Sequence, residues 1–174
     1  MAPKTSLDKF ANIAYLAVVE TAANTLTFAQ LQIASNLMDK KYALVIERIH
    51  YLVQPLATVF DTTGDYLNIA VTVSDRLSSI SDLSQPEILD LVQLQRRDYG
   101  AAASGSIEDS VIQRDFTSLS GGGILVPADR LYLGAKGSGL ASATTVLARM
   151  WYSVLEIGVN EYWELIEARR IMTT

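Results

Sequence analysis

The sequence predicts an all-β protein: a β-sandwich of about eight strands, closed by a C-terminal α-helix. Short runs rich in apolar and aromatic residues recur from Tyr15 to Ile157, with clusters of Gly, Ser, Pro and Asp between them. One run, Tyr66 to Ser74, alternates apolar and small or polar residues with the two-residue period of a strand. Only the stretch near the C-terminus has the signals of a helix.

Length and composition predict a single domain over residues 1–174, with residues 1–10 as a mobile tail. The chain has 174 residues, 49% of them apolar and 19% charged, which is an ordinary composition for one packed core. No linker, repeat or low-complexity tract divides it.

The first two predicted strands form a hairpin. Tyr15 to Glu20 leads through the polar turn Thr21 to Asn24 into Thr25 to Ile33. The apolar residues of the second strand change parity partway along, which predicts a bulge near Ala29 or Gln30.

Two of the following strands differ in their predicted burial. Tyr42 to Val53 is apolar on both parities, so we expect a central strand covered on both faces and ended by Pro55. Tyr66 to Ser74 reads as a half-buried strand. The remaining predicted strands are Glu87 to Gln95, Ser110 to Leu119, Ile124 to Val126 together with Arg130 to Leu133, and Ser142 to Ile157.

The terminal helix is predicted over residues 160–171. Asn160 is the expected cap of a helix from Glu161 to Ile171. Leu165 and Ile166, with Tyr162 or Trp163, would give it an apolar face that docks on the β body or on another subunit.

The residue inventory disfavours several functions. There is no cysteine and one histidine, His50, and the net charge is −5 with scattered Lys and Arg. We therefore expect no enzyme, no catalytic, cofactor-binding or metal-binding residue, and no direct contact with nucleic acid. The longest apolar run, Ile13 to Val19, is far shorter than the roughly 20 residues of a spanning helix.

Glycine-rich and acidic segments are expected to be structural. Gly121–Gly123 and Gly134–Gly139 lack the Lys-Ser/Thr ending of a phosphate loop, so they are predicted to supply positive-φ turns at strand ends. Asp61–Asp65 is expected to be a turn, because it lacks the further ligands of a calcium loop.

Two further groups of residues are candidate sites. Glu161, Glu164 and Glu167 are expected to form a solvated helix face, because the sequence offers no histidine beside them. Of the adjacent pair Trp151 and Tyr152, one ring should be in the core and the other available for an interface or ligand; the sequence leaves open which.

About eight strands and a closing helix fit an eight-stranded jelly roll, the sandwich of many capsid proteins, cupins and lectins. Three segments carry a closer resemblance: Gly123 to Gly134, the strand through Arg149 to Tyr152, and Glu161 to Glu164. With these the chain resembles the smaller major capsid protein of tailless, internal-membrane-containing Thermus bacteriophages. The resemblance implies a virion protein, made in the host cytoplasm, that self-associates as a homodimer or higher oligomer. It also implies co-assembly with a larger capsid protein into an icosahedral shell around an internal lipid membrane, and no catalytic residues.

We therefore expect a virion structural protein. Its candidate interface elements are the segment before Tyr15, the loops Asp75 to Pro86 and Tyr99 to Glu108, and the terminal helix. The alternative is a carbohydrate-binding β-sandwich module that uses exposed Tyr or Trp rings. A third reading, an enzyme of unrecognised type, would need a pocket that joins His50 to Ser and Asp.

Overall fold

The computed structural model describes residues 12–31, 42–54, 64–81, 83–95, 111–127 and 131–171. The predicted tail of residues 1–10, the Tyr99 to Glu108 loop and the strand end at Pro55 lie outside these ranges. So do most of the predicted Asp61–Asp65 turn and the end of the second predicted strand, at Ile33.

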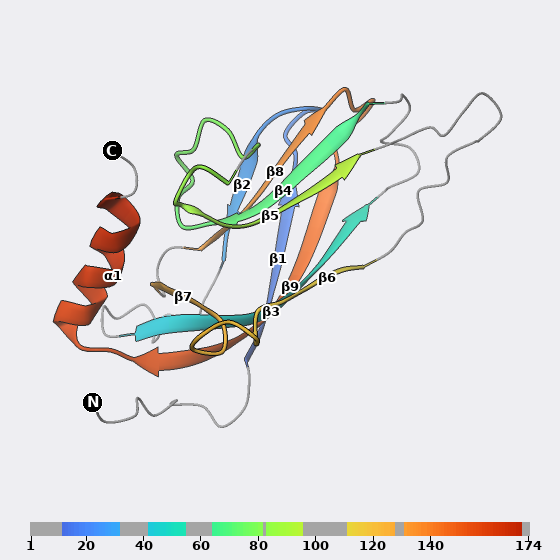
Figure 1. The fold of residues 1–174 in the computed structure, drawn as a ribbon. Coiled ribbons are helices and arrows are strands. Elements are labelled where there is room, and N and C mark those ends of the chain that lie inside the picture. Colours follow the sequence, from blue (N-terminus) through green and yellow to red (C-terminus); the bar gives the residue numbers. More distant parts are fainter. Residues whose placement is uncertain are drawn as a thin grey trace.

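The described residues form nine strands and one helix, which confirms an all-β fold with a C-terminal helix (Figure 1). The strands are β1 (Asn12–Val19), β2 (Thr27–Gln30), β3 (Tyr42–Gln54), β4 (Tyr66–Thr72), β5 (Ile88–Gln95), β6 (Ile112–Asp115), β7 (Ile124–Pro127), β8 (Tyr132–Ser138) and β9 (Thr145–Glu156). The helix is α1 (Val159–Ile171).

The strands pair as nested partners and form a jelly roll. β4 pairs with β5, β3 with β6 and β7, β2 with β8, and β1 with β9, all antiparallel. The first sheet has the order β1-β9-β3-β6, with β7 also on β3, and the second sheet has the order β2-β8-β4-β5. This is a long two-stranded ribbon rolled up so that successive pairs fall in alternate sheets.

The predicted hairpin of the first two strands is wrong. β1 pairs with β9 in the first sheet, and β2 pairs with β8 in the second. The turn between them carries the chain from one sheet to the other, because the rolled ribbon pairs each strand with a distant one. β2 also keeps a continuous register with β8 from Thr27 to Gln30, so the bulge predicted near Ala29 or Gln30 is not there.

A bulge occurs instead in β3, between Ile46 and Arg48, and it explains why the strand count exceeds eight. β7 pairs with β3 up to Ile46, and β6 pairs with it from Arg48 onward. Two short strands thus share one strand position on either side of the bulge. Residues 124–126 and 130–133, predicted as one strand, belong to different sheets, since β7 lies in the first and β8 in the second.

The core lies between the sheets, and β3 contributes its largest side chains. Leu44, Ile46, Ile49 and Tyr51 of β3 are at most 1% exposed. The predicted coverage of both faces holds only for the first half of β3, where Ala43 is also fully buried, while Arg48 beyond the bulge is exposed.

β4 is buried on both faces, so the predicted half-buried strand is wrong. The side chains of Ala70 and Thr72, on its outer face, are fully buried. The segment between β4 and β5, called here the β4–β5 segment, folds over this face and places fully buried Ile80 against Ala70 and Ile88. The local alternation predicts two faces correctly but cannot reveal that a later segment covers the outer one.

α1 begins earlier than predicted and packs across one end of the first sheet. Gly158, and not Asn160, precedes the helix, and its amide donates to the Glu161 carboxylate at 3.0 Å, half of a capping box. Tyr162 is 2% exposed and packs against Ala43 and Ile157. Of the predicted alternatives, Tyr162 is therefore the docking ring.

A buried carboxylate ties the two sheets together on the side of β1. Glu20 is 3% exposed and follows β1 directly. It accepts hydrogen bonds from the amide of Gly137 in β8 at 2.9 Å and of Thr144 before β9 at 3.1 Å. The first and second sheets are thus joined through one acidic side chain.

A second buried carboxylate ties the sheets on the opposite side. Asp90 of β5 is 3% exposed and accepts hydrogen bonds from the Tyr51 hydroxyl of β3 at 2.9 Å and from Arg114 of β6 at 2.8 Å. Burial and the Asp90 charge raise the pKa of Tyr51 well above its usual value. The hydrogen bond to Asp90 and its charge also raise the pKa of Arg114, so the Tyr51 hydroxyl and the Arg114 guanidinium both keep the protons that they donate. We call Asp90, Tyr51 and Arg114 together the clamp.

Candidate functional site

The first sheet exposes part of its outer face, beyond the end that α1 covers (Figure 1). Its side chains come from β1, β9 and β3, which are neighbours in the sheet. We call this surface the open face, and its residues are Ile13, Tyr15, Ala17, Val19, Arg48, His50, Leu52, Leu147, Arg149 and Trp151.

A row of three residues crosses the middle of the open face. Tyr15 of β1 lies opposite Arg149 of β9, which lies opposite His50 of β3. The Arg149 guanidinium is 5.1 Å from the centroid of the Tyr15 ring and 5.9 Å from that of the Trp151 ring. These distances are within the range of cation–π contacts, so the arginine and the two rings form one stacked cluster.

His50 belongs to the same cluster. Its ring centroid is 4.5 Å from that of Trp151. Partial burial and the charges of Arg48 and Arg149 lower the pKa of His50 below its ordinary value of 6.5, so the imidazole is neutral at pH 7. Its Nε2 is buried and has no hydrogen-bond partner among the described residues. The positive charge of this surface therefore comes from the two guanidinium groups.

The open face is hollowed at its centre. A depression of about 420 Å³ is lined by side chains that include Tyr15, His50, Val111, Leu147 and Arg149. Its lining is mainly apolar and aromatic with one guanidinium, which is the composition of surfaces that pack against another macromolecule.

β1 is an edge strand of unusual composition. It is eight residues long and contains no charged residue, proline or glycine. Three of its outward side chains are large and exposed: Ile13 by 48%, Tyr15 by 67% and Val19 by 58%. Edge strands are normally short or carry charges that prevent pairing with another chain, and β1 has neither protection.

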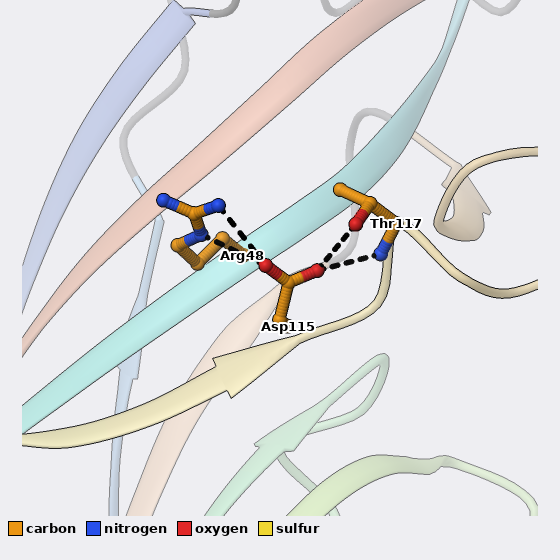
Figure 2. Close-up of polar contacts among 3 residues, drawn as sticks. All are labelled: Arg48, Asp115 and Thr117. Atoms are coloured by element: carbon orange, nitrogen blue, oxygen red, sulfur yellow. Dashed lines mark hydrogen bonds and ion pairs between the residues drawn. The ribbon is translucent and has the colours of Figure 1, made fainter.

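The opposite edge of the same sheet is protected. β6 has four residues, including Arg114 and Asp115. Figure 2 shows Arg48 donating to one oxygen of Asp115, at 3.0 Å from Nη2, while Thr117 donates to the other, at 2.9 Å from its amide. The hydrogen bonds from Thr117, together with Arg48, lower the pKa of Asp115, so its charge persists on this edge at neutral pH.

The structure decides between the two aromatic residues of the pair considered above. Tyr152 is 8% exposed and belongs to the core, whereas Trp151 lies on the open face. His50 lies on the open face as well, where its ring contacts the Trp151 ring at an angle of 59°. Its Nε2 has no hydrogen-bond partner among the described residues.

The glycine clusters divide into two kinds. Gly121, Gly122 and Gly139 have positive φ angles, as predicted for turns. The predicted turn is wrong for Gly134 and Gly137, because both lie inside β8. A β-carbon at Gly134 would come within 2.7 Å of the Phe28 ring. Close packing, and not turn geometry, requires glycine at that position.

The acidic residues show no metal centre in the described part of the chain. No group of three or more His, Cys, Asp or Glu side chains there could hold a metal ion. Glu161, Glu164 and Glu167 lie on α1, and Asp65 is buried beside Gly139.

Within the described residues, no helix combines the length and the apolar character that spanning a membrane requires.

Sequence reasoning missed Tyr15 and Arg149. A signal was present, because Leu16 and Val18 share one parity of β1 and the exposed apolar side chains share the other. This signal predicts an interface only once β1 is known to lie at a sheet edge, and only the structure shows that position.

The chain was compared with protein families, with curated proteins and with solved structures. The sequence matches no protein-family model and no curated protein. The structure is similar to a chain of tomato aspermy virus solved by X-ray crystallography, with a TM-score of 0.48 and 11% sequence identity over 85% of this chain and 80% of that chain. The fold assignment above follows from this chain's own strand order and register.

Proposed function

We propose that the protein is a virion structural protein, a capsid subunit that self-associates through the open face and the edge of β1. The single observation that carries the proposal is the coincidence of these two features: an apolar, aromatic sheet face adjoins an unprotected edge strand. A jelly roll supplies a rigid unit for a repeated contact.

The occupant of the open face is a second copy of this chain. Two copies related by a two-fold axis would set β1 antiparallel to its counterpart, which continues the first sheet of one copy into that of the other and brings their two open faces side by side.

The finer features of the proposal rest on the sequence resemblance to the small capsid proteins of Thermus bacteriophages. They are co-assembly with a larger capsid protein into an icosahedral shell, proximity to an internal lipid membrane, and a mature location in the virion after synthesis in the host cytoplasm. The proposal assigns no catalytic, cofactor-binding or metal-binding residue and no direct contact with nucleic acid.

The test is the molar mass of the purified chain by size-exclusion chromatography with light scattering, over a range of concentrations. Wild-type protein is expected to form a discrete dimer or larger closed species, and Tyr15→Asp to be monomeric. Leu83→Asp is the matched control, because Leu83 is also 67% exposed but lies on the β4–β5 segment over the other sheet.

Three outcomes would contradict the proposed contact: a monomeric wild type at every concentration, a Tyr15→Asp variant that associates like wild type, or a Leu83→Asp variant that dissociates equally. Co-purification from virions with a larger capsid protein tests the finer proposal separately.

A further inference from the structure

A second hollow, of about 390 Å³, lies on the outer face of the second sheet. Its floor is formed by two rows of the sheet, in which Tyr66 of β4 lies opposite Ser138 of β8 and Asn68 lies opposite Lys136. Ser79 of the β4–β5 segment lines it as well. Four adjacent strand positions and one covering segment thus build a single polar pocket.

The β4–β5 segment is held in place beside this pocket. Ile80 is fully buried in the small apolar cluster over β4, so the serines on either side of it are fixed in position. The hydroxyls of Ser79 and Ser81, which both line the hollow, are 2.6 Å apart. A pair of preordered hydroxyl groups therefore forms one wall.

Asn68 is a buried polar residue whose side-chain amide is only partly hydrogen-bonded within the fold. Its side chain is 2% exposed, and one end of its amide is hydrogen-bonded to Gln93 at 3.0 Å. The other end has no hydrogen-bond partner among the described residues. In either orientation of the two paired amides, one polar atom of Asn68 is left for a group in the pocket. Because Asn68 lines the hollow, a bound group can hydrogen-bond to its side-chain amide.

The chemistry of the lining defines the ligand class. The pocket offers serine hydroxyls, the Asn68 amide, the Tyr66 phenol and the Lys136 ammonium, and no carboxylate of the described chain lines it. Hydroxyl and amide groups match the hydroxyls of a sugar ring, and the ammonium matches an acidic substituent. We propose that this pocket binds an acidic sugar, with its carboxylate at Lys136 and its ring hydroxyls at Asn68 and the serines.

This site is independent of the open face, because the two lie on the outer faces of different sheets. It also differs from the aromatic surface expected of a carbohydrate-binding module, since Trp151 is not part of it. A shell protein with such a pocket would attach to acidic polysaccharide.

The experiment is a titration of the full-length protein, followed by isothermal calorimetry and by amide chemical shifts, with glucuronate, glucose and inorganic sulfate as probes. Glucuronate is expected to bind saturably, with the largest shifts at residues 66–68 and 136–138. Glucose should bind about tenfold more weakly, because it lacks the group that pairs with the ammonium. Sulfate should show no saturable binding at these residues.

Lys136→Met is expected to weaken glucuronate binding about tenfold and to leave glucose binding unchanged. Arg76→Met is the matched control, because Arg76 is an exposed cation of the β4–β5 segment outside the pocket lining, and it should bind like wild type. Ser79→Ala provides a second variant that leaves the sheet intact and should weaken both sugars.

The proposal is overturned if glucuronate does not saturate, if sulfate binds as tightly as glucuronate at the same residues, or if Lys136→Met binds like wild type. The light-scattering test of self-association uses different variants, so either result can fail without the other.

Discussion

The outer faces of the two sheets differ sharply although both belong to the same sandwich. On the first sheet, Tyr15 is 67% exposed in an apolar surface that no described segment covers. On the second, the β4–β5 segment covers the middle strands and buries Ile80 completely. Apolar residues on an outer sheet face need a cover, and the second sheet receives its cover from its own chain. Among the described residues, the first sheet has no such cover over Tyr15.

The largest expected loss of stability comes from removing the side chain that packs over the second sheet. Ile80→Ala should lower the free energy of unfolding by about 3 kcal/mol, because it removes a fully buried side chain and leaves a cavity over β4. Chemical denaturation measures the change. The same substitution at Ile13, which is 48% exposed on the open face, is the control and should cost less than about 1 kcal/mol. Equal losses at the two positions would remove the distinction between the faces.

The next effect concerns the clamp that holds the two sheets, and hence the two faces, together. Tyr51→Phe removes the hydroxyl that donates to buried Asp90 and should lower the free energy of unfolding by about 2 kcal/mol.

For comparison, Arg48→Gln breaks the Arg48–Asp115 ion pair, whose side chains are 47% and 49% exposed. Its effect on the free energy of unfolding should be much smaller than that of Tyr51→Phe, since solvent screens such pairs. A loss for Arg48→Gln that equals that for Tyr51→Phe would contradict the clamp.

A smaller effect on stability is expected at the open face itself. Tyr15→Ser should change the free energy of unfolding of the monomer, measured at concentrations below association, by about 0.5 kcal/mol or less. It should nevertheless raise the concentration at which the chain associates. If instead the monomer is strongly destabilised, Tyr15 has a role in folding and its exposure is not a sign of an interface.

The smallest effect concerns proton binding by His50, which lies on the open face. The pKa of His50 should lie below 6.5. The folded state thus binds fewer protons than the unfolded state, and stability falls as the pH drops through 6.5 toward the folded pKa. Since His50 is the single histidine, its NMR signals report this titration directly.

Arg149→Gln removes one of the charges that lower this pKa and should raise it, whereas Arg76→Gln should leave it unchanged. A wild-type pKa at or above 6.5 would contradict the burial and charge environment of the ring, and an unchanged pKa in Arg149→Gln would contradict the proximity of that guanidinium.

By itself, the sequence determined the local structure. The two-residue alternation located most strands, and the polar and glycine clusters located most turns, because both depend on neighbours along the chain. The exception is the region of β7 and β8, where two strands were predicted as one and Gly134 was expected in a turn. The terminal helix was also predictable, although its start shifted from Asn160 to Val159. The burial of the outer residues of β4 could not be predicted, because it depends on tertiary contacts with the β4–β5 segment that the alternation does not encode.

Only the tertiary structure decided which strands pair and which faces remain open. Tyr15, Arg149 and His50 come from three separate parts of the chain and meet because β9 lies between β1 and β3. Asn68 and Lys136 meet because β4 lies beside β8. A strand's pattern shows that it has two faces, but every antiparallel partner fits the same period, so pairing is decided by how the whole ribbon rolls to bury its core.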